Sequence, residues 1–121
     1  LYSLKGKVIL LNFTGIGCGA CQMAIPFLKE LKEQYPADDF ELIAIESWSG
    51  SNSARTHYVK QKGINYSFLG ADEKVLDDYH TGRAAPYFIL LDEKRIVRKV
   101  FFGYNENNKN EIKDAIDKML K

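Results

Sequence analysis

Much of the architecture follows from residues 8–31, which read VILLNFTGIGCGACQMAIPFLKEL. The opening residues continue a nearly uninterrupted apolar run over residues 7–14, which is typical of a strand buried on both faces of a sheet. Gly15 then allows the chain to turn. From Cys18 to Tyr35 the apolar residues recur every three or four positions, and Pro36 follows, which predicts an amphipathic helix. The turn between strand and helix carries both cysteines of the chain.

The rest of the chain predicts further elements in a regular order. The other predicted strands are residues 40–47, 66–69, 86–92 and 96–103. The other predicted helices are residues 52–62, ended by Gly63, and residues 72–79. A C-terminal amphipathic helix follows, with Asn108 and Glu111 as an approximate capping box and apolar positions between Ile112 and Leu120.

The connections between these elements indicate how the strands pair. The link between residues 92 and 96 is too short for a crossover, so the last two strands form an antiparallel hairpin. The strand–helix–strand order of the first half requires parallel crossovers. The prediction is an α/β fold with a central mixed β-sheet and helices on both faces.

Composition is ordinary for one globular domain, with 121 residues, 45% hydrophobic and 27% charged. We expect residues 1–121 to form a single domain, and because residue 1 is Leu rather than Met, a fragment of a longer precursor. A net charge of +1 without basic runs argues against nucleic acid or an anionic membrane as a partner. The longest apolar runs are far shorter than the roughly 18 to 20 residues that span a bilayer.

The cysteine pair indicates redox chemistry. A helix N-terminus presents unpaired N–H groups and partial positive charge, which favour a thiolate. Such cysteines have pKa values lowered from about 8.5 to roughly 3.5–7.5. We expect Cys18 to be the exposed nucleophile and Cys21 the shielded resolving thiol, because a mixed disulfide must be attacked from within.

Residues 8–31 resemble the active-site segment of thioredoxin-like proteins, in which a proline follows the second cysteine by five residues; here it is Pro26. A second match lies in AAPYFIL, where Pro86 corresponds to the family's cis-proline. The resemblance covers residues 7–121. The segment between the second strand and the short helix is most similar to envelope thiol-disulfide oxidoreductases of the TlpA and ResA type.

The resemblance also implies a substrate-binding surface. The backbone at Ala85, just before Pro86, should pair with an extended substrate chain. Gly19 and Ala20 should form a flat surface around the sulfur, and Tyr87 should add a contact.

Several positions depart from the thioredoxin pattern. Asn12 stands where thioredoxins carry a buried aspartate, and an amide cannot act as the general base for the resolving thiol. Thr14 and Gly17 replace two tryptophans, which predicts a more open site. The Gly-Ala dipeptide between the cysteines argues against a strongly oxidising protein. The N-terminal strand of thioredoxin is missing from these residues, so either the protein lacks it or it lies before Leu1.

Two further side chains are candidates for supporting roles. Glu46 ends a buried strand near the site and could relay a proton to Cys21, although we favour a simple carboxylate at the rim. Trp48, the sole tryptophan, could fill space left by Thr14 and Gly17 or pack under a loop. Among the aromatic residues near the end of the chain, Phe101, Phe102 and Tyr104 are most simply core and strand.

Other uses of a Cys-x-x-Cys pair are less well supported. Zinc needs two further ligands, and His57 and His80 show no suitable spacing, so we expect no metal. A structural disulfide would close a very short loop and constrain the unfolded chain little. A thiol peroxidase would need Thr and Arg around a single peroxidatic cysteine, and no such arrangement is evident.

The sequence thus predicts a thiol-disulfide oxidoreductase that works through Cys18 and Cys21, more as a reductant than an oxidant, and without a cofactor. The alternative is a redox-inert thioredoxin-like module that binds a protein partner. We expect protein disulfides or dithiols as substrates, a separate regenerating redox partner, and a monomer. The resemblance implies a periplasmic or envelope location.

Overall fold

The computed structural model describes residues 6–79 and 84–120. Within them lie five strands, namely β1 (Val8–Thr14), β2 (Phe40–Glu46), β3 (Ser67–Gly70), β4 (Tyr87–Leu91) and β5 (Val97–Phe102). The helices are α1 (Gly19–Gln34), α2 (Asn52–Lys62), α3 (Glu73–Asp78) and α4 (Glu106–Met119). Every predicted strand and helix is therefore present, with ends shifted mostly by one or two residues, although α4 begins three residues before the start that a cap at Asn108 would give.

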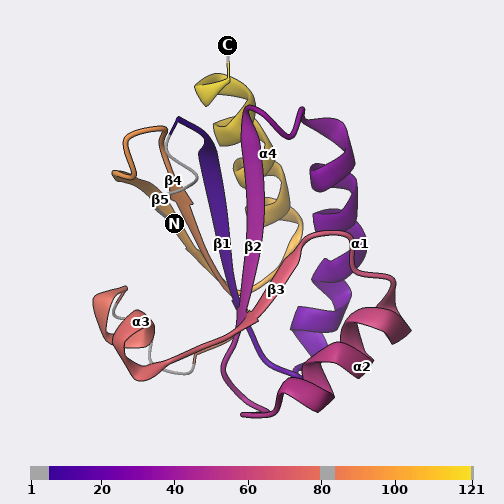
Figure 1. Ribbon diagram of the computed structural model, residues 1–121. Coiled ribbons are helices and arrows are strands. Elements are labelled where there is room, and N and C mark those ends of the chain that lie inside the picture. The colour runs from indigo at the N-terminus through magenta and orange to yellow at the C-terminus, as the bar shows by residue number, and fades with distance from the viewer. Residues whose placement is uncertain (1–5, 80–83, 121) are drawn as a thin grey trace.

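The five strands form one mixed sheet in the order β3-β2-β1-β4-β5 (Figure 1). β1, β2 and β3 run parallel, whereas β4 is antiparallel to both β1 and β5. Thr14 pairs with Glu46, and Phe13 pairs with Tyr87. The carboxyl ends of the three parallel strands and the amino end of β4 therefore meet at one edge of the sheet, the lower edge in Figure 1.

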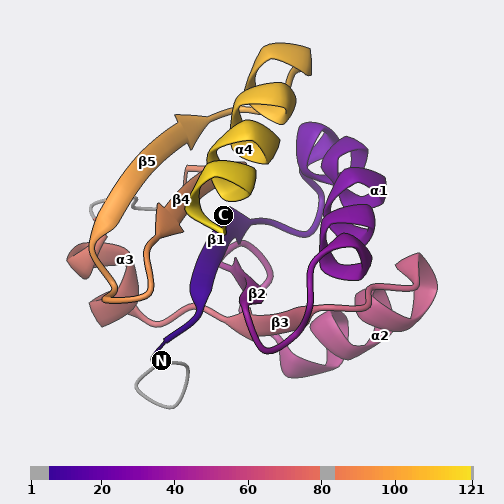
Figure 2. The ribbon, with the colours of Figure 1, turned by 90° about the horizontal axis from the view of Figure 1, so that it is seen from above.

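Helices cover both faces of the sheet, as predicted (Figure 2). Side chains alternate along β1, so Val8 and Leu10 join a core with α1 and α4, while Ile9 and Leu11 pack on the opposite face with α3. Both faces are buried, which explains the continuous apolar run. α2 flanks β3 instead, where the rings of Tyr58 and Phe68 are 5.6 Å apart.

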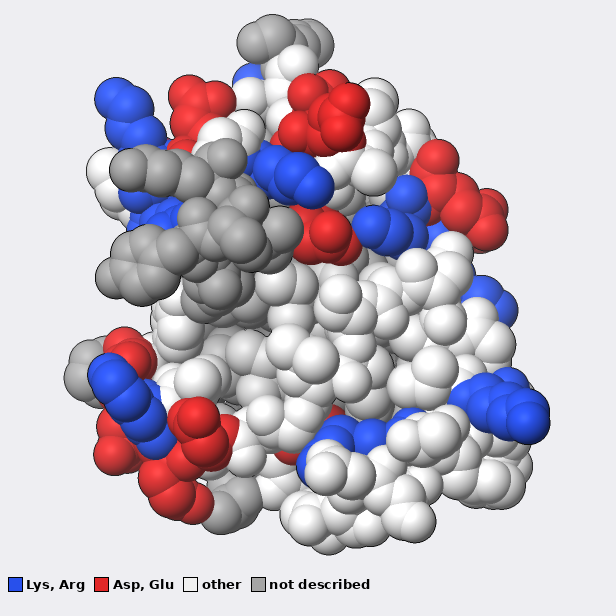
Figure 3. Space-filling view, in the orientation of Figure 1, with Lys and Arg blue, Asp and Glu red and all other residues white. Residues whose placement is uncertain are grey.

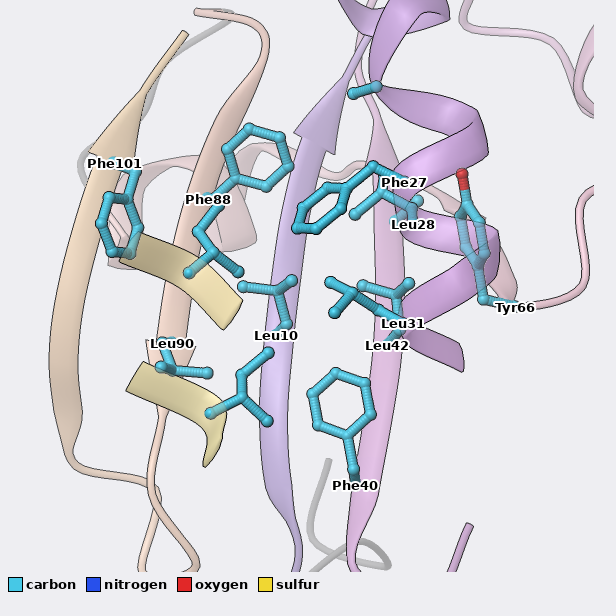
Figure 4. Packing of buried hydrophobic residues seen from close by; sticks show 14 of the residues in the cluster. Leu10, Phe27, Leu28, Leu31, Phe40, Leu42, Tyr66, Phe88, Leu90 and Phe101 are labelled. Atoms are coloured by element: carbon cyan, nitrogen blue, oxygen red, sulfur yellow. The ribbon is translucent and has the colours of Figure 1, made fainter. Parts of the chain in front are cut away.

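The larger core lies between the sheet and helices α1 and α4 (Figure 4). Figure 4 shows side chains from β1, β2, β4 and α1 directed toward one another, among them Leu10, Leu28, Leu42 and Leu90. Burying each such side chain contributes about 1.5–3 kcal/mol. This packing holds the middle of α1 against the sheet.

The expected capping box of α4 is wrong, and one of the aromatic residues expected in core and strand lies in β5 but is exposed. The N-cap of α4 is Asn105, whose side chain accepts the backbone N–H of Asn108 at 2.8 Å. The side-chain amide of Asn108 donates to the carbonyls of Phe102 and Gly103 instead of capping the helix. Phe102 is exposed although Phe101 is buried, because successive strand side chains point to opposite faces.

Candidate active site

The two cysteines form a disulfide at the start of α1, with their Cα atoms 5.2 Å apart. Cys18 is the N-cap residue, and its Sγ accepts the N–H of Cys21 at 3.2 Å. In the reduced protein this N–H, together with the partial positive charge of the helix end, would stabilise a thiolate on Cys18.

Exposure does not distinguish the cysteines in this disulfide form. Cys18 is 6% exposed and Cys21 is 3% exposed, so the expectation of an exposed Cys18 is wrong here. The accessible surface next to the sulfurs comes instead from Gly17, Gly19 and Ala20. Because these residues are small, a substrate backbone could approach closely.

A tight turn leads from β1 to Cys18. The Cys18 N–H donates to the Gly15 carbonyl at 3.2 Å, and Gly17 has φ +102°. This combination matches a type II β-turn, whose third residue needs a positive φ and is usually glycine. The turn sets the direction in which Cys18 enters α1.

Trp48 covers this turn. Its indole ring lies against Gly15, and the side chain remains 46% exposed. Thr14 is itself buried within β1. Trp48 therefore packs on Gly15, and its filling of space left by Thr14 and Gly17 stays a prediction.

Glu46 is 1% exposed, so the favoured interpretation as a rim carboxylate is wrong. Its Oε2 accepts the N–H groups of Ile16, Trp48 and Ser49 at 3.1, 2.7 and 2.8 Å. Burial raises the pKa of this carboxyl, but the hydrogen bonds from Ser49, Ile16 and Trp48 outweigh burial and lower the pKa overall. Among the described residues, its carboxylate has no hydrogen bond to Cys21, so the relay to Cys21 stays untested.

Ser49 and Arg55 complete the Glu46 site and were not singled out in the sequence. The Ser49 hydroxyl and the Arg55 guanidinium both donate to Oε1 of Glu46, Arg55 at 3.3 Å. The available signal was Glu46 directly after the apolar run of residues 42–45, since a buried carboxylate needs charged or hydrogen-bonding partners.

Residues at the start of β4 reach the same edge of the sheet. The Ala85–Pro86 peptide bond is cis, the geometry that the resemblance implies. Pro86 is buried, and its carbonyl accepts the N–H of Gly103 at 2.9 Å. Tyr87 packs on the α3 face of the sheet, edge-on to Phe102, whereas α1 covers the opposite face. The structure thus places Tyr87 away from the face that carries the cysteines.

Two predicted supporting residues lie on the strand and helix of the site. Asn12 is buried in β1, and its Nδ2 has no hydrogen-bond partner among the described residues. Pro26 lies within α1 and is exposed.

The two described segments that flank the cysteines and Trp48, residues 15–28 and 47–54, are uncharged. No charged residue occurs in residues 15–28 or 47–54, and exposed side chains there include Gln22 and Met23. In Figure 3, charged side chains crowd α3 at the lower left, while much of the lower middle surface is uncharged. A partner would therefore meet mostly small and apolar groups.

The described residues contain neither a candidate metal site nor a helix that could span a membrane. Within 6–79 and 84–120, no group of three or more His, Cys, Asp or Glu side chains could hold a metal ion. His57 is exposed on α2, and His80 lies outside the described residues. None of the described helices has the length and apolar character needed to cross a membrane.

Comparisons with known proteins agree with this geometry. A family model named Redoxin matches residues 1–116. Thiol-disulfide oxidoreductase ResA of Bacillus thuringiensis (strain Al Hakam) is 25% identical over 120 residues, covering 98% of this chain and 67% of ResA. ResA of Bacillus subtilis (strain 168) is 28% identical over 102 residues, covering 83% and 56%. The predicted resemblance to ResA-type proteins is confirmed.

Two solved structures share the fold. A thiol:disulfide interchange protein, thioredoxin family protein, from Chlorobium tepidum TLS superposes with a TM-score of 0.84 at 22% identity, covering 99% of this chain and 84% of that one. A thiol-disulfide isomerase from Corynebacterium glutamicum gives 0.86 at 18% identity with the same coverage. The predicted thioredoxin fold is confirmed, and since the family match runs from β1 through the cysteine turn into α4, the chain belongs to the Redoxin family.

Proposed function

We propose that this protein is a thiol-disulfide oxidoreductase that reduces disulfides in other proteins. The observation that carries the proposal is the Cys18–Cys21 disulfide at the start of α1, where the Cys21 N–H points to the Sγ of Cys18. A helix start that holds a sulfur against an N–H group favours the thiolate needed for exchange. ResA, the name of several curated relatives, is a thiol-disulfide oxidoreductase.

The reaction transfers two electrons in two exchanges. The Cys18 thiolate attacks one sulfur of a substrate disulfide, so an enzyme–substrate S–S bond forms and the other substrate sulfur leaves as a thiolate that takes up a proton. Cys21, once deprotonated, attacks the Sγ of Cys18, which releases the second substrate thiol and restores the Cys18–Cys21 disulfide. A separate dithiol partner must then reduce this disulfide. The protein's own sulfurs carry the electrons, so the cycle needs no cofactor.

The proposed substrate is an extended, mostly uncharged segment of another protein. Gly19 and Ala20 leave space for its backbone near the sulfur, and Ala85 offers main-chain groups beside Pro86. Because residues 15–28 and 47–54 carry no charge, exchange rates should depend little on ionic strength.

We also propose that residues 1–121 work as a single monomeric domain in the cell envelope. The location rests on the resemblance to TlpA- and ResA-type proteins.

A redox titration in glutathione or dithiothreitol buffers tests the proposal. Trp48 fluorescence and thiol alkylation report the state of the pair, with Cys18→Ser and Cys21→Ser as controls. We expect a two-electron transition between about −270 and −120 mV, and reduction of insulin disulfides that both substitutions abolish. A transition below about −300 mV without insulin reduction would instead support the redox-inert binding module.

A further inference from the structure

We propose that Glu46 is a positioning residue for Cys18. Its buried carboxylate holds the cysteine turn, residues 15–18, and the Trp48 loop, residues 47–50, in one fixed arrangement. The inference rests on the proposed function, because it concerns how the same cysteine is kept reactive. Glu46 acts through the backbone that it binds and not by touching the sulfur.

The first contact is with the cysteine turn. Ile16, the second residue of the Gly15–Cys18 turn, donates its N–H to Oε2 of Glu46 at 3.1 Å across 30 positions of sequence. One residue from Glu46, the Ser47 N–H donates to the Thr14 carbonyl at 3.0 Å. The turn is thus tied to the end of β2 on both sides of Gly15.

The second contact is with the Trp48 loop. The same Oε2 atom accepts the N–H groups of Trp48 and Ser49, and Oε1 accepts the Ser49 hydroxyl. The Trp48 ring in turn lies on Gly15. A single carboxylate therefore connects the turn before Cys18 to the aromatic side chain that covers that turn.

Arg55 provides the positive charge that compensates for burying the Glu46 carboxylate. A buried charge without a partner is strongly destabilising, and the Arg55 guanidinium lies 3.3 Å from Oε1 of Glu46. The guanidinium also lies over Gly70, where a Cβ would come within 2.6 Å of it. Glu46 is thus anchored to α2 and β3 as well as to the site.

This arrangement has a consequence for Cys18. The stabilisation of its thiolate depends on the Sγ staying close to the Cys21 N–H, now 3.2 Å away. If the turn loosens, that contact is made less often and the thiolate loses stabilisation. Removing the Glu46 carboxylate should therefore raise the pKa of the Cys18 thiol and slow its reactions near neutral pH.

The test measures Cys18 alkylation by iodoacetamide from pH 5 to 10 in the Cys21→Ser protein, with further substitutions added. We expect Glu46→Ala to shift the midpoint upward by about one pH unit, which is about tenfold less thiolate at a pH below both midpoints. Glu46→Gln should shift it less, because the amide oxygen can still accept the N–H groups of Ile16, Trp48 and Ser49.

The matched control is Glu41→Ala in the same strand. Glu41 binds Lys32 at 2.9 Å and the Leu42 N–H, but at the opposite end of β2. The Glu41→Ala substitution should lower the urea midpoint without shifting the pH dependence of Cys18 alkylation. If the alkylation midpoint is the same in the Glu46→Ala and Glu41→Ala proteins, Glu46 is merely structural and the inference is wrong.

Two further measurements keep the outcomes separate. If Glu46→Ala does not fold, Ser49→Ala replaces it, since it removes one of the hydrogen bonds to Oε1 and should give a smaller upward shift; an unchanged profile would again overturn the inference. The protein with both cysteines tests the proposed function by itself through its redox titration. If the redox titration shows the expected two-electron transition but the Glu46 and Ser49 substitutions do not shift the alkylation midpoint, only the role of Glu46 is rejected.

Discussion

The indole ring of Trp48 occupies the position that a side chain at Gly15 would need: a Cβ built on Gly15 would lie 2.2 Å from both Cγ and Cδ2 of the ring. Glycine is therefore required here by the close approach of another side chain. The requirement joins a residue before the cysteine turn to the loop after β2.

Gly15→Ala should displace Trp48. Overpacking of this kind costs typically about 1–3 kcal/mol, so the urea midpoint should fall. The emission of Trp48, the sole tryptophan, should shift to longer wavelength as the ring becomes more exposed. Gly19→Ala is the matched control, because no atom lies within 4 Å of a Cβ there. Equal stability losses in both variants would contradict the packing explanation.

Asn12→Leu should leave stability unchanged or raise it. The Nδ2 of Asn12 is buried without a hydrogen-bond partner among the described residues, and such a group costs about 1–3 kcal/mol. Leucine is of similar size and removes that polar group. Urea unfolding of the two proteins at pH 7 gives the comparison. A clear loss of stability would show that the Asn12 amide is satisfied in solution, for example by a bound water.

Acid should destabilise the protein through Glu46 and Asp92. Hydrogen bonds outweigh burial at Glu46, and at Asp92 the Ile96 N–H and further bonds from Lys94 and Arg98 lower the pKa. A carboxyl with a lowered pKa stabilises the fold fully above its unfolded pKa, about 4.3 for Glu and 3.9 for Asp, and this is lost as pH falls through the folded value. The urea midpoint should therefore hold between about pH 5 and 7 and fall below about pH 4.

The acid effect can be assigned with single substitutions. Glu46→Gln and Asp92→Asn should each lower stability at pH 7 and reduce the further loss at pH 3, because neither side chain can then take up a proton. If both variants lose as much stability between pH 7 and pH 3 as the unsubstituted protein, other carboxyls are responsible.

Leu10→Ala should cost about 2–5 kcal/mol, because Leu10 is fully buried between the sheet and helices α1 and α4. Leu69→Ala is the control within the same sheet. Leu69 is 55% exposed, so its truncation should change stability by less than about 0.5 kcal/mol. Similar costs at both positions would mean that the assigned faces of the strands are wrong.

The sequence by itself was sufficient for the order and type of the elements. Apolar runs and helical periodicity are local signals, and the short link after Asp92 permits only a hairpin, so the mixed sheet followed. The cysteine pair at the start of α1 was readable for the same reason, since strand, turn and helix are contiguous in the chain. Pro86 was found by resemblance.

Only the tertiary structure decided what surrounds the cysteines. β1 and β2 pair in the register that sets Thr14 opposite Glu46. This register brings the Ile16 N–H within hydrogen-bonding distance of the buried Glu46 carboxylate. Trp48 on Gly15 depends on the same pairing, and Tyr87 faces α3 because of its position in β4. A shift of one residue in register would turn the side chains of Glu46 and Tyr87 to the other face, and no local pattern specifies register at a strand end.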